Sequence, residues 1–188
     1  MSKWRLQYFV LSGVFAALIF ATAFLLGAGI IMATGIPATG GIANILGAVL
    51  VLVVGAQLVP RFGFGMLTMG LMFTLAIPTL IGGPPGAFKI ANGILVGLVF
   101  DVAVTLGSRR TWAYVVAGSL AAVTSITSIY AAMVLLGLPG VQKLQPLLLP
   151  LTVMQAITGA VGAWLATVIY QRRLRNLRFV RQLLDEST

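Results

Sequence analysis

The side chains that most often perform catalysis or bind metals are almost absent from this sequence. It contains no Cys and no His, which excludes thiol catalysis, disulfides, thiolate metal sites and imidazole general bases. Its only acidic residues are Asp101, Asp185 and Glu186. Because so few groups can move protons or hold metal ions, we expect no enzymatic activity, no cofactor and no metal site.

The polar side chains that remain could recognise a ligand, because several stand inside long apolar segments where burial is costly. Lys89 and Asn92 are three residues apart, which places them on one face of a helix. The candidates share a depth in the outer half of their segments: Lys89, Asn92, Tyr130, Thr152, Gln155, Thr127 and Asn44. We expect them to line a substrate pocket that opens to the outside.

Each candidate also has an ordinary structural interpretation. Lys89 could extend its ammonium group to the outer interface instead of facing a pocket. Ser and Thr side chains in membrane helices often bond back to their own backbone. Interhelical hydrogen bonds that only hold the bundle together are the competing explanation for the whole set.

Asp101 lies about 18 Å from Lys89 along the same predicted helix, so the two charges cannot pair. It lies close in sequence to Arg109 and Arg110. We expect a structural ion pair between Asp101 and Arg109. The alternative is a carboxylate that binds a proton and couples it to transport.

The elements that must position these residues are membrane helices. The chain has 188 residues, of which 60% are hydrophobic and 8% charged, which rules out an ordinary soluble globule. A helix needs roughly 20 apolar residues to cross a bilayer. Charges and Gly/Pro clusters divide the chain into six such segments: 6–32, 41–59, 63–81, 86–106, 111–138 and 146–170. The sequence therefore predicts one all-α membrane domain with six transmembrane helices.

The basic residues predict the orientation of this bundle. The net charge of +9 comes from 12 Lys and Arg against three acids. If both termini are cytoplasmic, ten of the 12 fall on the cytoplasmic side, as the positive-inside rule requires. In so apolar a chain this charge indicates topology and anionic membrane lipid rather than nucleic acid.

The two ends of the chain have their own patterns. Residues 171–188 have helically spaced apolar residues between arginines, which predicts a basic amphipathic tail on the inner leaflet. A docking surface for another subunit is the alternative.

Near the N-terminus, Ala21-Thr22-Ala23 could pass for a signal-peptide cleavage site. The apolar run continues to Met32, so we expect an uncleaved first helix.

Two uncharged external loops and one stripe of small residues complete the candidates. The loops contain Pro37 and the group Gly83, Pro84 and Pro85, and we expect them to gate the pocket. Plain turn chemistry would explain them equally well. Gly13, Ala17 and Ala21 are spaced four residues apart, which would let another helix approach closely, within the bundle or on a partner subunit.

These features resemble the substrate-binding membrane subunit (S component) of energy-coupling-factor (ECF) transporters, which import vitamins and related micronutrients into prokaryotic cells. The resemblance covers nearly the whole chain, including six short helices and the Gly/Pro loop of IANILGAVLVLVVGAQLVPRFGFGMLTMGLMFTLAIPTLIGGPPGAFKIANGILVGLVFD. Ala17 to Ala21 matches the family's Ala-x-x-x-Ala contact with a coupling subunit.

The resemblance implies a high-affinity binding subunit in the inner or plasma membrane. It would take up a small organic substrate from outside and work with a transmembrane coupling subunit and two cytosolic ATPases. The chain has no G-x-x-x-x-G-K-[ST] phosphate loop of its own. The absence of His argues against the nickel and cobalt branch of the family. In such a pocket Lys89 would suit an anionic group on the substrate.

Three other classes remain open. A self-sufficient small permease or channel would need a continuous polar path, and Asp101 is the only deep charge in the inner half. A membrane enzyme would have to use Lys89 or Tyr130 as its catalyst. In a structural or assembly subunit, the outer polar cluster would only hold the helices together.

Overall fold

The computed structural model describes residues 6–34, 37–138 and 141–175, with the backbone alone described for 28–34, 37–43 and Lys143. These residues form helices and turns without a strand, which confirms the all-α class. The main helices are α1 (Leu6–Thr34), α2 (Pro37–Leu58), α3 (Phe64–Leu75), α4 (Phe88–Leu106), α5 (Thr111–Leu135) and α7 (Leu148–Ile169). The short elements are α6 (Val141–Leu144), a 3₁₀ turn (Gln145–Leu147) and a π-helical turn (Tyr170–Leu174).

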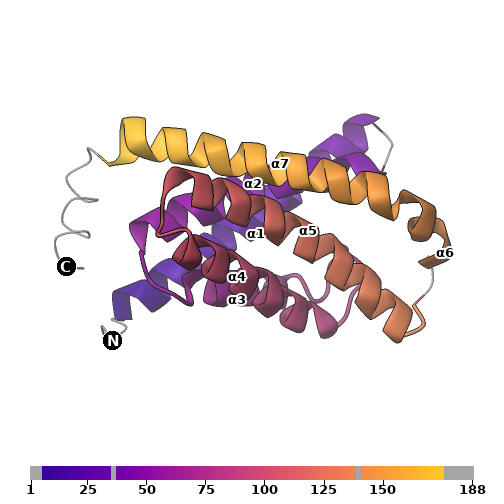
Figure 1. Cartoon of the computed structure of the whole chain (residues 1–188). Helices are drawn as coiled ribbons and strands as arrows, with labels where there is room; N and C mark the ends of the chain where they lie inside the picture. The colour runs from indigo at the N-terminus through magenta and orange to yellow at the C-terminus, as the bar shows by residue number, and fades with distance from the viewer. Residues whose placement is uncertain (1–5, 35–36, 139–140, 176–188) are drawn as a thin grey trace.

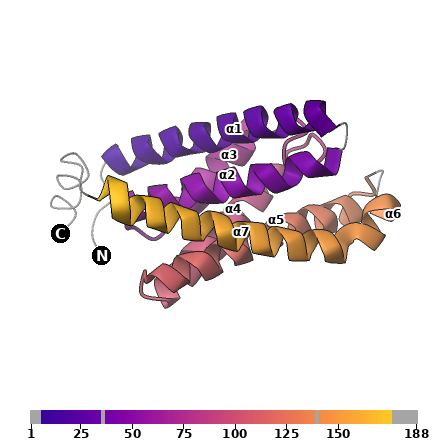
Figure 2. The ribbon, with the colours of Figure 1, turned by 90° about the horizontal axis from the view of Figure 1, so that it is seen from above.

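The six main helices run back and forth and form a closed ring (Figure 1). Each packs on two neighbours, in the order α1, α2, α7, α5, α4 and α3. Figure 2 shows α2 lying between α1 and α7. We call the end of the bundle where α1 begins and α7 ends the terminal end, and the opposite end the α6 end.

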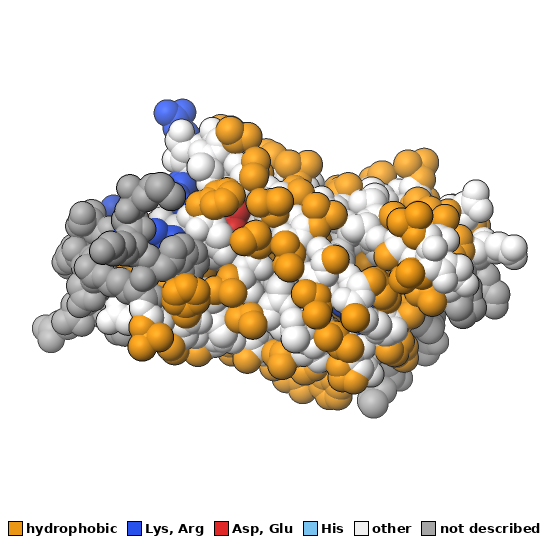
Figure 3. All heavy atoms as spheres, turned by 90° about the horizontal axis from the view of Figure 1, so that it is seen from below, with side chains coloured by type: hydrophobic (Ala, Val, Ile, Leu, Met, Phe, Trp, Pro, Cys, Tyr) orange, Lys and Arg blue, Asp and Glu red, His pale blue; other side chains and the backbone are white. Residues whose placement is uncertain are grey.

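Four stretches of the described chain are long and apolar enough to cross a membrane: Leu6–Gly27, Phe88–Leu106, Thr111–Leu135 and Gln145–Leu174. The described apolar stretches of α2 and α3 are shorter. Large hydrophobic side chains cover much of the face in Figure 3, and the basic side chains visible there gather at the terminal end. An apolar outer surface of this kind suits lipid rather than water.

The third helix is shorter than the segment 63–81 predicted from the sequence. It ends at Leu75, and residues 76–87 form turns. Pro78 explains the difference, because proline lacks an N–H group and its ring would collide with the carbonyl of Thr74 in a continuing helix. Twelve residues of helix span only about 18 Å, so α3 by itself is too short to cross a bilayer core of about 30 Å.

α3 and α4 touch backbone to backbone through glycines. A Cβ atom at Gly93 of α4 would lie 2.5 Å from the carbonyl oxygen of Met69 on α3. A Cβ at Gly97 would collide with the backbone of Gly65 and Met66. Small residues at such crossings bring helices close enough for dense packing in lipid.

This close approach also lets Asp101 of α4 cap the start of α3. Its carboxylate is buried and accepts hydrogen bonds from the backbone N–H groups of Gly63, Gly65 and Met66, each at 3.0 Å. A negative charge at this position also complements the positive end of the helix dipole. The predicted structural role of Asp101 thus takes a different form, because its hydrogen-bond partners are backbone amides and Arg109 adds only an electrostatic interaction.

Replacement of Gly97 by Ala tests the α3–α4 contact. We expect destabilisation of about 1–3 kcal/mol, because the new methyl group meets backbone atoms that cannot rotate away. Gly13→Ala is the matched control, because no atom lies within 4 Å of a Cβ at Gly13. Thermal unfolding in detergent should show a lower midpoint for Gly97→Ala and an equal or higher one for Gly13→Ala. Equal midpoints in the two variants would contradict the packing.

Candidate functional site

A cavity of about 300 Å³ lies inside the helix ring. Its wall draws on all six main helices and on the turn segment after α3. The helices contribute, in chain order, Ala23, Ile45, Met72, Val96, Ile126 and Gln155, among others. Pockets for small organic molecules have volumes of roughly 300–1,000 Å³ and mostly apolar walls. In size and chemistry this cavity fits a small ligand.

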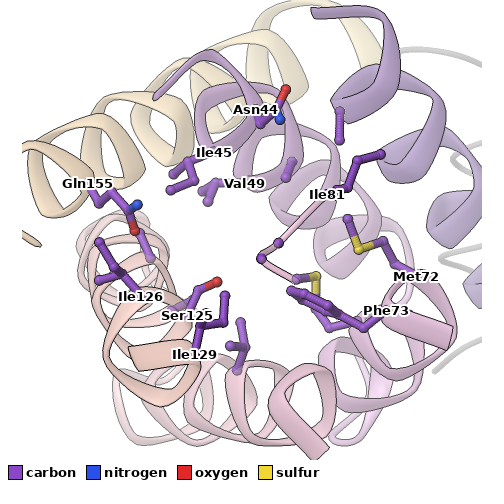
Figure 4. Close-up of a pocket in the computed structure, with 18 of the residues that line it drawn as sticks. Asn44, Ile45, Val49, Met72, Phe73, Ile81, Ser125, Ile126, Ile129 and Gln155 are labelled. Atoms are coloured by element: carbon purple, nitrogen blue, oxygen red, sulfur yellow. The ribbon is translucent and has the colours of Figure 1, made fainter. Parts of the chain in front are cut away.

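Three polar side chains interrupt the apolar wall: Asn44 of α2, Ser125 of α5 and Gln155 of α7. Figure 4 shows the Ser125 hydroxyl and the Gln155 amide pointing into the cavity, with Asn44 at its edge. The Asn44 Oδ1 and Gln155 Oε1 atoms are buried without a hydrogen-bond partner. A buried acceptor left unpaired costs about 1–3 kcal/mol. A ligand with N–H or O–H donors would remove that cost most directly at Gln155, because the Asn44 amide lies at the edge of the cavity against Gly27 of α1.

The turn segment after α3 closes part of the cavity wall. Leu80, Ile81, Gly82 and Gly83 all line the cavity. Gly82 and Gly83 have φ angles of 68° and 103°, which side chains other than glycine rarely adopt. Non-helical backbone at membrane depth persists only where protein or a cavity satisfies its polar groups.

Lys89 satisfies the carbonyl groups of this segment. Its ammonium group is fully buried and donates to the carbonyl oxygens of Ala76, Thr79 and Ile81 at 2.9, 2.7 and 2.9 Å. All three N–H bonds are therefore used within the chain. Lys89 is not among the residues that line the cavity, nor does its side chain reach the surface of the bundle. Its observed role is to fix the turn segment, and contact with a ligand stays a prediction.

Asn92 and Thr127 lie on a different surface, an open groove between α4 and α5. The Asn92 Oδ1 accepts a hydrogen bond from the Ser128 hydroxyl. The Thr127 hydroxyl bonds back to the Val123 carbonyl at 2.8 Å, as expected for Thr in a membrane helix. The predicted polar strip of Lys89 and Asn92 is therefore divided between the turn segment and this groove.

The other predicted residues lie outside the cavity wall as described. Tyr130 and Thr152 are half-buried, and neither they nor Pro84 and Pro85 line the cavity. Gly83 does line it. Pro37 is the first residue of α2, and its side chain lies outside the described residues. So does most of the predicted amphipathic tail, from residue 176 onward.

The small-residue stripe of α1 faces outward. Ala17 and Ala21 are exposed, Gly13 is half-buried, and a Cβ at Gly13 would meet no atom within 4 Å. The opposite side of α1 packs into the core through Ala16, Ile19 and Ala23. The stripe is thus available to another helix in the membrane.

Sequence reasoning grouped Asn44 and Gln155 by their predicted depth, and the structure brings both to one cavity. It did not select Ser125, although this residue lies in the Ser/Thr-rich part of the fifth segment. Ala122, Ser125, Ile126 and Ile129 repeat at spacings of three and four residues and all line the cavity. That helical periodicity was the available signal.

No family model, curated protein or solved structure matches this chain.

Replacement of Lys89 by Met tests its role in the turn segment. The Met side chain has a similar reach but removes the ammonium donor from the carbonyls of Thr79 and Ile81. The Ala76 carbonyl keeps the backbone N–H and hydroxyl of Thr79 as donors. Because unpaired buried carbonyls are costly, we expect the amides of residues 79–86 to exchange hydrogen at least about tenfold faster. Amides in the middle of α5 serve as the internal control. Unchanged exchange in 79–86 would show that Lys89 does not hold this segment.

Proposed function

We propose that this chain is the substrate-binding membrane subunit of an ATP-driven importer of the energy-coupling-factor type in a prokaryotic cell membrane. The observation that carries the proposal is the cavity enclosed by all six helices, with two buried acceptors that lack partners. Such a site is built to hold one small molecule. The transport role is inferred from the resemblance between the architecture of the whole chain and that of S components.

The charge distribution supports a six-span orientation with the terminal end in the cytoplasm. Arg61, Arg109 and Arg110 lie in the connections at the terminal end, and Arg172 and Arg173 follow α7 there. By the positive-inside rule this end faces the cytoplasm. The turn segment that closes the cavity belongs to the α6 end and then faces outward, so the ligand enters from outside.

The cavity wall indicates the chemistry of the ligand. None of the described lining residues is Lys, Arg, Asp or Glu. An anionic substrate, as expected from Lys89, would therefore find no opposite charge there. We propose instead an uncharged, largely apolar organic molecule with hydrogen-bond donors for Asn44 and Gln155.

The core between the cavity and the terminal end favours a coupled importer over a self-sufficient permease. It is filled by buried apolar side chains, including Phe64 and Phe100. Phe15 and Phe64 meet edge to face, with their ring centres 5.9 Å apart. A substrate that must pass this barrier needs a large movement of the bundle. A coupling subunit would dock on the exposed stripe of α1. Two ATPases would supply the free energy for this movement.

Filling the cavity tests the binding site. The proposal predicts that a small molecule co-purifies with the wild-type chain. Ser125→Phe places a ring in the cavity, and we expect it to reduce the amount of that molecule at least tenfold. Thr127→Phe, on the outer face of the same helix, is the matched control and should keep the molecule. Mass spectrometry of extracts from the purified variants measures both. Equal retention by both variants would remove the cavity as the binding site.

Ala17→Phe tests coupling separately from binding. The larger side chain blocks close approach of another helix, so ATP-dependent uptake should fall at least about tenfold while the co-purifying molecule is retained. Leu18→Phe, a neighbouring exposed position, should leave uptake near the wild-type rate. Normal uptake by Ala17→Phe in membrane vesicles would exclude docking through this stripe.

A further inference from the structure

A second pocket, of about 310 Å³, opens at the terminal end between α2, α5 and α7. Its chemistry is opposite to that of the main cavity. Eight of its nine lining residues have polar side chains, and the ninth is Pro60. Two of the eight are Arg109 and Arg175, and none is acidic. This combination is typical of a site for an anion.

The polar wall is held by hydrogen bonds between helices. Gln57 Nε2 donates to Thr167 Oγ1 at 3.3 Å, and the Tyr170 hydroxyl donates to the Gln57 carbonyl at 3.3 Å. Gln171 Nε2 donates to Thr111 Oγ1 at 3.2 Å. Gln57 and Thr167 are more than nine-tenths buried. The pocket therefore has a fixed floor rather than a loose surface of solvated side chains.

The two arginines approach this floor from different elements. Arg109 stands in the α4–α5 connection, is half-buried and interacts electrostatically with the Tyr114 side chain. Arg175 follows the π-helical turn after α7. Between them α5 begins at Thr111, with no acidic residue in its first turn and no side-chain cap. The positive end of the α5 dipole adds to the two guanidinium charges.

The described part of the chain has no free carboxylate to neutralise the two arginines of this pocket. Its one acidic residue is Asp101, and the carboxylate already accepts three amide hydrogen bonds at the start of α3. Asp101 does act electrostatically on Arg109, but it does not line the pocket. Among the described residues, therefore, no carboxylate is left to serve as the counter-anion of Arg109 and Arg175.

The position of the pocket favours one source of that anion. Three of the stretches able to cross a membrane meet at this end: Phe88–Leu106 ends there, Thr111–Leu135 begins there, and Gln145–Leu174 ends there. Where these stretches cross a bilayer, the pocket lies at the level of the lipid headgroups. Anionic headgroups are abundant at that level, and basic pockets between membrane helices bind them.

We propose that this pocket binds the phosphate group of an anionic membrane lipid. Arg109 and Arg175 hold the phosphate oxygens, and hydroxyl and amide groups such as those of Thr111 and Gln171 complete the hydrogen bonds. The bound lipid bridges α5 and the end of α7, and so ties the π-helical turn to the bundle. This site is separate from the main cavity and does not depend on what that cavity holds.

The test is lipid titration of the full chain in a non-ionic detergent, followed by native mass spectrometry. The probes are phosphatidylglycerol, inorganic phosphate and a diacylglycerol with the same acyl chains but no phosphate. The test variant is the double replacement Arg109→Gln and Arg175→Gln. Arg172→Gln with Arg173→Gln is the matched control, because it removes the same charge from exposed positions outside the pocket. Unfolding midpoints check that both variants fold.

We expect the pocket variant to bind phosphatidylglycerol at least about tenfold more weakly than wild type, since it loses two charge-assisted contacts. The control variant should stay within about threefold, and diacylglycerol binding should not respond to either variant. Equal losses of phosphatidylglycerol binding in both variants would show that the lipid responds only to general surface charge, and would overturn the proposal. If only inorganic phosphate binds with this dependence, the ligand is free phosphate and the lipid assignment is wrong.

Discussion

Two buried charges on α4 hold the two ends of α3, and the arrangement of the bundle depends on them. Asp101 accepts three amide hydrogen bonds where α3 begins, and Lys89 donates to three carbonyls where it has ended. The two charges are 12 positions apart on α4, which corresponds to about 18 Å, the length of α3 itself. Lipid offers no hydrogen bonds to open backbone groups. The short helix and its turns are tolerated because α4 satisfies them.

The cavity follows from this arrangement. Because α3 stops at Leu75, the turn segment from Leu80 to Gly83 enters the space that a full-length helix would have filled, and becomes a wall of the cavity. Asp101 and Lys89, the two charges that make this possible, form their hydrogen bonds with backbone groups. What remains for a ligand is an apolar surface with the amides of Asn44 and Gln155. The same constraint thus accounts for the existence of the cavity and for the absence of charged side chains among its described lining residues.

Much of the fold could be predicted from the sequence because apolar segment length and basic clusters are strong signals. Depth along a helix also identified Asn44 and Gln155. The signals failed where a local backbone feature decided the outcome. Pro78 ends α3 early, and Lys89 donates to carbonyls of the turn segment that follows, a role that the sequence did not indicate. Contact between Lys89 and a ligand stays a prediction. Helical periodicity would have found Ser125, but Ser in a membrane helix carries little information by itself.

The central claim is that the ring of six helices holds one small uncharged organic molecule. An experimental density map of the chain, purified from its native membrane, tests this most directly. The account predicts density for a single compact molecule between Asn44, Ser125 and Gln155, with Lys89 still bonded to the turn segment. A map in which the cavity is collapsed or holds only water, or in which Lys89 contacts the bound molecule as its counter-charge, would contradict it.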